Sequence, residues 1–244
     1  MEIGFFLIAA PAVVFAGISK GGFGSGAAFA SAAILAIVLP PAQALGIMLP
    51  LLMLIDVATL RPYWGKWSWG DAKVLILGGV PGVALGAGLF TVADDDLLRL
   101  LIGTVALGFV LWRLWPAARA RAPIPVWGGL LAGVAAGFTS FISHAGGPPV
   151  AVYLLSRGVG KTTYQATTVL IFWVINIAKA VPYAFLGVFT LENLVIDLWL
   201  APFALLGAWV GVKAHHMVPE RLYFAVTYVL LGLTGGKLVW DALS

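Results

Sequence analysis

A series of long apolar runs constrains this chain more than any other feature. Ten apolar segments follow one another with short gaps, and several reach the roughly 20 residues with which a helix spans a bilayer. None shows sustained alternation of apolar and polar residues, so helices are expected rather than the strands of a membrane barrel. The sequence therefore predicts an all-α polytopic membrane protein. The segments are 3–18, 26–39, 43–60, 72–92, 97–115, 124–142, 147–156, 163–186, 193–212 and 222–240.

Composition argues against a soluble fold. The 244 residues are 61% hydrophobic and 10% charged, whereas a soluble domain carries roughly 25% charged residues. The apolar segments leave no room for a second, soluble domain. We therefore expect one multi-pass protein, integral to the cell (plasma) membrane and surrounded by the lipid bilayer. The chain has no cysteine, which excludes disulfides and thiolate metal sites. Its basic residues are scattered among loops, so no nucleic-acid partner is expected.

The ten segments fall into two sets of five that match at a nearly constant offset of 120 to 121 residues. Each set runs long, short, long, long, long. We interpret this as an internal duplication, with a first transmembrane repeat at 1–116, a cytoplasmic linker at 117–123 and a second transmembrane repeat at 124–244. The matching pairs are Ser19 and Thr139, Gly26 and Gly146, Pro62 and Pro182, Tyr63 and Tyr183, Asp71 and Glu192, Pro81 and Pro202, and Gly86 and Gly207.

Loop charges predict the orientation. If 61–73 is cytoplasmic, then 113–125, 157–162 and 213–221 are cytoplasmic too, and these regions hold ten of the 14 lysines and arginines. Most acidic residues, including 94–96, fall on the opposite side. By the positive-inside rule both termini lie on the non-cytoplasmic side. Because each repeat has an odd number of segments, the two repeats are inverted. The long and short segments that open each repeat either cross twice or form a re-entrant hairpin.

Glycine- or proline-rich breaks interrupt both repeats at corresponding places. In transporters built from inverted repeats, substrate sites lie near the membrane midplane at such helix breaks. Helices beginning near Ser25 and Gly147 would point free N–H groups and positive dipole ends inward. The candidate substrate-binding residues are Ser19, Lys20, Gly21, Gly22, Gly24, Ser25 and Gly26 in the first break, and Thr139, Ser140, Ser143, His144, Gly146 and Gly147 in the second.

The chemistry of these breaks suits a small oxyanion. Serine and threonine hydroxyls donate hydrogen bonds, Lys20 adds a positive charge, and His144 adds one when protonated. The alternative interpretation is structural: the glycines only allow helices to pack closely, and Lys20 reaches to an interface.

Three further polar residues lie inside apolar segments and are candidates for coupling or gating: Asp56, Asn176 and Lys179. Charged groups inside a membrane are costly, so their presence points to function. Asp56 and Asn176 correspond at the repeat offset. The structural alternatives are that Asp56 pairs with Arg61 and that Lys179 reaches to the membrane surface.

Other features are interpreted as structural. Capping or bonding between helices explains the corresponding residues Gln43 and Gln165 as well as ligand contact does. Glycines at four-residue spacing allow helices to approach closely in lipid. These ladders are Gly78-Gly82-Gly86, Gly129-Gly133-Gly137, Gly207-Gly211 and Gly232-Gly236.

Complete enzyme motifs are absent: the sequence has no HExxH and no GxxxxGK[ST], and Gly17-Ile18-Ser19-Lys20-Gly21 matches the letters of GxSxG but follows an apolar helical run rather than a strand. We therefore expect no enzyme activity, no cofactor and no metal site. The aspartates at 94–96 are interpreted as a solvated loop that caps the helix from Leu97.

The duplicated hydropathy and the Ser-x-x-x-x-Gly-x-Gly pattern at Ser19, Gly24 and Gly26, echoed at Thr139 and Gly146, resemble the TauE/SafE sulfite-exporter family. The resemblance covers essentially the whole chain, with one family unit in each half. It implies a permease for small sulfur-containing anions or organic acids.

The second half departs from the common pattern of that family. His144 stands where Gly24 stands in the first half, and Pro148-Pro149 replaces a plainer run. This departure bears on the particular substrate more than on the class of transport.

Three functions are weighed. The first is a secondary transporter that moves a small anion, such as sulfite, a sulfonate or a related organic acid, by alternating access at a midplane site between the breaks, with a coupling proton or ion as a further partner. The second is a passive anion or small-solute channel that uses the same breaks as a filter. The third is a membrane-embedded enzyme or assembly factor using His144 and Asp56, which the lack of paired catalytic carboxylates disfavours.

Overall fold

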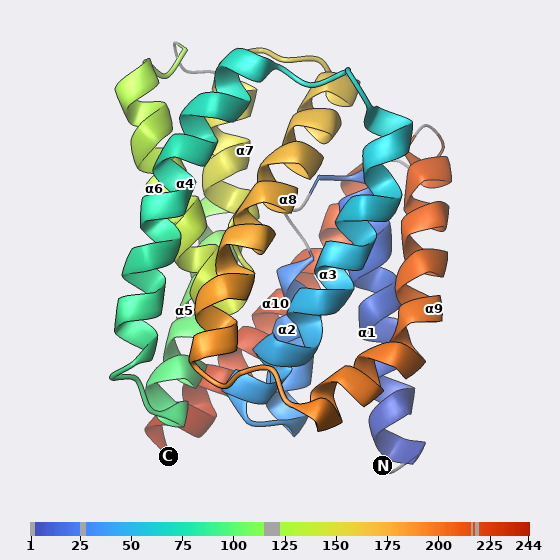
Figure 1. The fold of residues 1–244 in the computed structure, drawn as a ribbon, viewed down its shortest axis with the longest axis vertical. Helices are drawn as coiled ribbons and strands as arrows, with labels where there is room; N and C mark the ends of the chain where they lie inside the picture. Colours follow the sequence, from blue (N-terminus) through green and yellow to red (C-terminus); the bar gives the residue numbers. More distant parts are fainter. Residues whose placement is uncertain (1–2, 25–27, 115–122, 216, 218–219) are drawn as a thin grey trace.

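The computed structural model describes residues 3–24, 28–114, 123–215, 217 and 220–244 (Figure 1). Over these residues the chain forms ten helices and no strands, which confirms the predicted all-α polytopic fold. The helices are α1 (Ile3–Gly22), α2 (Phe29–Val38), α3 (Pro41–Tyr63), α4 (Trp69–Phe90), α5 (Asp95–Leu114), α6 (Val126–Ser143), α7 (Gly147–Ser156), α8 (Lys161–Phe185), α9 (Leu191–Ala214) and α10 (Glu220–Leu243).

Helix length separates spanning helices from short ones. Six helices, α1, α3, α4, α6, α8 and α9, are long and apolar enough to cross a membrane. The helices α2 and α7 have 10 residues each, about 15 Å at 1.5 Å per residue, which is too short to cross. They are the two short segments that the sequence predicts. The chain is therefore a multi-pass integral membrane protein.

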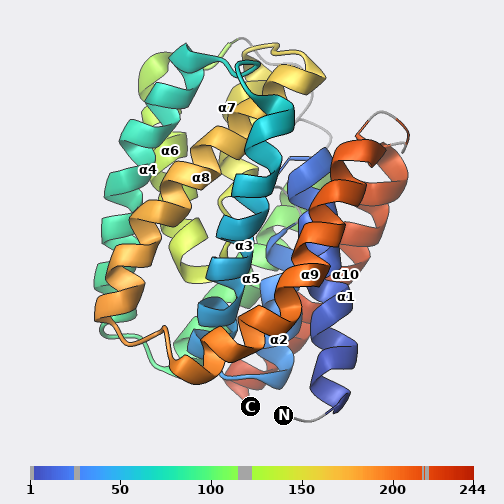
Figure 2. The same ribbon diagram turned by 45° about the vertical axis from the view of Figure 1, so that its right-hand side comes forward.

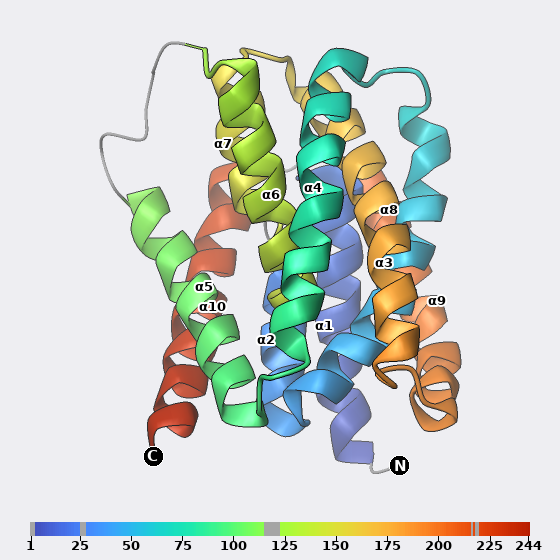
Figure 3. The same cartoon turned by 60° about the vertical axis from the view of Figure 1, so that its left-hand side comes forward.

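Each short helix returns to the end of the molecule from which the preceding long helix came. In Figure 1, α1 rises from the end where the chain begins, and α2 runs back to that end; Figure 3 shows α6 entering from the opposite end and α7 returning there. The arrangement within the protein is that of two re-entrant hairpins. Corresponding helices run in opposite directions in these views, as α1 and α6 do, and as α3 and α8 do.

The two halves of the chain interlock. Helix α4 packs along α6, and its counterpart α9 packs along α1, an arrangement that Figure 2 shows from a second side. Glycines make the close approach: a Cβ added at Gly82 would lie 2.9 Å from the Phe138 nitrogen, and one at Gly211 would lie 2.6 Å from the Ile18 oxygen. The packing role predicted for these ladders is confirmed there. It does not hold for Gly232-Gly236, since no described atom lies within 4 Å of a Cβ built on either.

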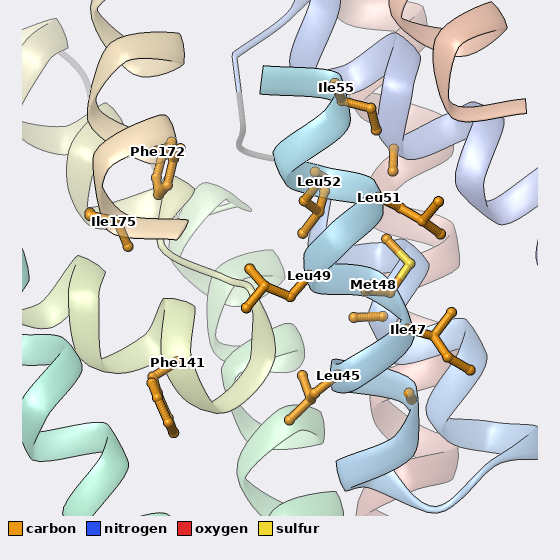
Figure 4. Close-up of a cluster of buried hydrophobic side chains, with 14 of the residues drawn as sticks. Leu45, Ile47, Met48, Leu49, Leu51, Leu52, Ile55, Phe141, Phe172 and Ile175 are labelled. Carbon is orange, nitrogen blue, oxygen red and sulfur yellow. The ribbon is translucent and has the colours of Figure 1, made fainter. Parts of the chain in front are cut away.

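Helix α3 runs through the centre of the apolar core. In Figure 4, Leu49 and Leu52 point toward the side on which Phe172 and Ile175 of α8 lie, whereas Leu51 points to the opposite side. All five side chains are at least 95% buried. A helix that is apolar on all sides belongs in a core. Asp56 of α3 and Asn176 and Lys179 of α8 are held deep inside the protein.

The loops of the two sets predicted from their charges lie at opposite ends of the molecule. The loops after α3 and α7 lie at one end, where Arg157 pairs with Asp71 at 3.2 Å. The loops after α4 and α8 lie at the other end, together with the start of α1 and the end of α10 (Figure 1). The predicted cap of α5 is confirmed, because the Leu97 N–H donates to Asp94 Oδ1 at 2.8 Å. The predicted cytoplasmic linker at 117–123 lies, apart from its last residue, outside the described residues.

Candidate functional site

A chain of buried polar side chains links α1, α3 and α8. Lys20 Nζ lies 2.6 Å from Asp56 Oδ1. Asn176 Nδ2 donates to the other carboxylate oxygen, Asp56 Oδ2, at 2.7 Å, and Lys179 Nζ donates to Asn176 Oδ1 at 3.3 Å. None of these four residues is more than 2% exposed. The three candidates for coupling or gating therefore form one continuous network with Lys20.

The network continues from Lys179 into the second break. Lys179 Nζ donates to Ser140 Oγ at 3.2 Å and lies 2.6 Å from His144 Nδ1. The other ring nitrogen, His144 Nε2, lies 3.1 Å from the Leu45 carbonyl oxygen. A carbonyl oxygen only accepts, so Nε2 carries the proton and Nδ1 accepts from the lysine. His144 is thus a neutral bridge between Lys179 and the backbone of α3.

The backbone of His144 has an unusual conformation. Its φ is 55°, the only positive φ of a non-glycine residue in the described part of the chain. Gly24, its counterpart in the first repeat, has a φ of 75°. A side chain is disfavoured in this left-handed region, and strained backbone persists where the surrounding structure holds it, often at functional sites. At His144, the two hydrogen bonds of the ring provide that support.

The two repeats contribute matching sets of polar residues. Lys20, Asp56 and Thr59 correspond to Ser140, Asn176 and Lys179 at the 120-residue offset. The first set has one positive and one negative group, whereas the second has one positive group alone. With His144 neutral, the network carries a formal charge of +1 when both lysines are protonated.

Each break is tied to the central helix of the other half. The Gly24 N–H donates to Gln165 Oε1, and Gln165 Nε2 donates to the Lys20 carbonyl at 2.5 Å. In the second half, His144 binds the carbonyl of Leu45, and Leu45, rather than Gln43, lies 120 residues before Gln165. Of the explanations left open for Gln165, the structure shows bonding between helices.

Two tyrosines repeat this correspondence. Tyr63 Oη donates to the Gly21 carbonyl at 2.6 Å, and Tyr183 Oη donates to the Phe141 carbonyl at 2.6 Å. Both bonds join residues 42 positions apart in the sequence. The ends of α1 and α6 are thus held in the same way in both halves.

The breaks themselves are shorter than predicted. Helix α1 continues to Gly22, so 17–22 is helical, and α2 begins at Phe29 rather than near Ser25. Helix α6 continues to Ser143, which leaves 144–146 between α6 and α7. A helical glycine costs only about 1 kcal/mol relative to alanine, and an unsatisfied backbone group inside a membrane costs several. Ser25 and Gly26 lie outside the described residues, and α7 begins at Gly147, as expected.

Several predicted glycines contact helices rather than the network. A Cβ on Gly21 would lie 2.6 Å from the Ala208 oxygen, and Gly22 lies against Gly211. A Cβ on Gly146 would lie 2.7 Å from the Ala136 oxygen. At these three positions the glycines allow close helix packing, which is the structural alternative, and we do not assign them to the substrate site.

Most of the predicted hydroxyls bond within their own break. Ser19 Oγ donates to the Gly24 carbonyl at 3.2 Å, and Thr139 Oγ1 donates to the Ala145 carbonyl at 3.0 Å. Ser143 Oγ donates to the Thr139 carbonyl at 2.8 Å. Of the predicted hydroxyls in the described residues, Ser140 is the one that joins the network.

The structural alternatives for the intramembrane charges do not hold. Asp56 pairs with Lys20 and not with Arg61, and Lys179 is fully buried, so it does not reach to a surface. Sequence reasoning missed one buried acid, Asp197 of α9, which is 6% exposed. A lone acid inside the apolar run 193–212 was the signal that could have identified it.

The sequence was compared with known proteins. The family model described as sulfite exporter TauE/SafE matches residues 9–238, nearly the whole chain. No curated protein and no solved structure matches the chain.

Proposed function

Because the chain belongs to the TauE/SafE sulfite-exporter family of membrane transporters, we propose that it is a secondary transporter of a small anion such as sulfite, a sulfonate or a related organic acid. The proposal rests on one observation above all: a fully buried network in which two lysines face a single aspartate. We assign the anion site to Lys179, Ser140 and His144, with Lys20, Asp56 and Asn176 beside it.

The charge balance at Lys179 supports an anionic substrate. Its Nζ contacts Ser140, His144 and Asn176, which are all neutral, and no carboxylate of the described residues lies within ion-pair distance. A buried charge is stable only when it is paired or well hydrogen-bonded. An oxyanion that replaces one of the neutral acceptors neutralises the excess charge. Asp56 is already paired with Lys20 and leaves Lys179 available.

The N-terminus of a helix adds to the positive electrostatic potential that favours an anion. Helix α7 begins at Gly147, three residues after His144, with Pro148 in its first turn. The N-terminus of a helix presents free N–H groups and a partial positive charge. A broken helix whose N-terminus faces the middle of the membrane is the arrangement that anion transporters use.

The relation between the halves supports alternating access. We infer that 1–116 and 124–244 are inverted repeats, because corresponding helices run in opposite directions and corresponding residues make the same bonds (Figures 1 and 3). Transporters of this kind move one bundle of helices against another around a fixed site, and the packing of α1 on α9 and of α4 on α6 places helices of both repeats in each bundle. The bonds of Gly24 to Gln165 and of His144 to Leu45 are the ones we expect to open in turn.

Counterflow in proteoliposomes tests the proposal. Vesicles containing the purified protein and unlabelled sulfite should accumulate radiolabelled sulfite in a saturable way. In the variant Lys179→Met, uptake should fall at least about tenfold, corresponding to about 1.4 kcal/mol of lost interaction. Lys66→Met is the matched control, because Lys66 is exposed and its ammonium group donates to the Pro62 carbonyl at the end of α3, away from the network.

Two results would overturn the proposal. A folded protein that exchanges no sulfite, sulfonate or carboxylate is not an anion transporter of this kind. Flux that never saturates and shows no counterflow would identify a passive channel instead.

A further inference from the structure

Asp197 is a buried carboxyl group that the transport site leaves without a role. It lies in the second turn of α9 and is 6% exposed. Both of its carboxyl oxygens are buried and have no hydrogen-bond partner among the described residues. Asp56, in contrast, has Lys20 and Asn176.

No charged group of the neighbouring helices faces Asp197. Helix α9 packs on α1 and α3. Contacts of Gly207 with Val14 and of Gly211 with Ile18 set a parallel register that places Asp197 beside the first turns of α1. Helix α1 has no titratable side chain before Lys20, and α3 has none before Asp56.

Nearby charges on other segments are also few. On α9 the nearest charged residue is Glu192, five positions earlier, and the loop 186–190 that packs against α3 at Gly46 carries none. An ionised carboxylate without a partner in apolar surroundings is strongly disfavoured. The packed structure therefore accommodates Asp197 in its protonated, neutral form.

A hollow lies beside this part of α9. It has a volume of about 370 Å³, and its lining includes Glu192 and Ile196 of α9, Gln43 of α3 and Gly4 of α1. Ile196 is the chain neighbour of Asp197. The hollow lies at the end of the molecule where α1 and α9 begin. Asp197 itself does not line the hollow, so a movement of α9 is needed to bring its carboxyl group to water there.

Close backbone packing connects α9 to the helix that carries Lys20. A Cβ on Gly17 would lie 2.6 Å from the Ala208 nitrogen, and one on Gly21 would lie 2.6 Å from the Ala208 oxygen. Contacts this tight leave no space for one helix to move without the other. A shift of α9 that exposes Asp197 to water therefore displaces α1, and with it Lys20.

From these contacts we propose that Asp197 is the proton-binding site that couples transport to a proton gradient. The inference rests on the proposed transport function. The carboxylate takes up one proton from water on one side of the membrane when α9 is exposed, the neutral carboxyl returns to the packed position, and the same proton is released to water on the other side when the transporter opens there. The corresponding residue in the first repeat is Ile76, so the coupling group is present in only one half and carries one proton in each cycle.

The test separates exchange from coupled uptake in the same vesicles. Wild-type protein should show both sulfite counterflow and accumulation driven by a pH gradient, with proton movement recorded by an internal pH dye. Asp197→Asn has nearly the same shape but cannot release a proton. It should keep counterflow within about twofold, a change of less than about 0.5 kcal/mol, and lose both gradient-driven accumulation and coupled proton movement. Asp96→Asn, an exposed residue paired with Arg99, should change neither.

The possible failures are distinguishable. Absence of counterflow in the wild-type protein would overturn the proposed function. Wild-type counterflow without gradient-driven uptake, or gradient-driven uptake that survives in Asp197→Asn, would overturn the role of Asp197 alone. If Asp197→Asn does not fold, Asp197→Glu keeps a protonatable group: coupled uptake with a displaced pH dependence supports the inference, and an unchanged pH dependence contradicts it.

Discussion

At the scale of single residues, the pairing of Lys20 with Asp56 forms the centre of the network. The pair is buried at 2.6 Å, and Asn176 satisfies the second carboxylate oxygen. A buried ion pair adds little net stability, but removal of one partner leaves an unpaired charge. The effect on stability of replacing Lys20 should therefore depend on whether Asp56 is present, and the reverse.

A double-mutant cycle measures this dependence. Asp56→Asn should destabilise the protein by about 3–5 kcal/mol, because it leaves Lys20 buried without a carboxylate. Lys20→Met combined with Asp56→Asn should recover most of the loss, since neither charge remains. The measurement is the free energy of unfolding in detergent for the two single variants and the double variant. Additive losses would show that the residues do not interact.

The sequence predicted part of this site. The repeat offset related Asp56 to Asn176, and the cost of intramembrane charge identified Lys179. The sequence did not predict the partner of Asp56, because Lys20 and Asp56 meet only when α1 packs beside α3. It assigned Gly21 to ligand contact, whereas the structure places this residue against α9. Glycine patterns alone do not distinguish a ligand loop from a close helix contact.

At the scale of helices, glycines determine how closely α4 approaches α6. The apolar runs predicted all ten helices because each run overlaps one helix over most of its length. Helix ends were less predictable: 17–22 remained helical although it contains three glycines. Inside a bilayer, the loss of helical backbone hydrogen bonds costs more free energy than the low helix propensity of glycine.

Two glycines of α4 provide a matched comparison. A Cβ on Gly82 would lie 2.9 Å from the Phe138 nitrogen of α6, whereas no described atom lies within 4 Å of one on Gly88. Gly82→Ala should cost about 1–3 kcal/mol through overpacking, and Gly88→Ala should be neutral or stabilising by up to about 1 kcal/mol. Thermal unfolding in detergent distinguishes them. Equal effects of the two substitutions would contradict the packing described for α4 and α6.

At the scale of the whole molecule, the paired hairpins bring one charged network to the place where the halves meet. Lys20 comes from α1, Lys179 from α8, and His144 from the break between α6 and α7. No single helix carries the site, so its net charge depends on the assembly of both halves. The hydropathy and loop charges predicted the two sets of helices, but the interlocking of α4 with α6 and of α9 with α1 required the structure.

Ligand-induced stabilisation of the purified protein tests most directly whether this network binds a small anion. A ligand at 100 times its dissociation constant stabilises the native state by about 2.7 kcal/mol. With a panel of sulfite, sulfonates and small carboxylates, we expect at least one anion to raise the unfolding temperature of the wild-type protein and of Lys66→Met, and to leave Lys179→Met unchanged. Equal stabilisation of Lys179→Met, or no stabilisation of the wild-type protein by any of these anions, would contradict the assignment of the site.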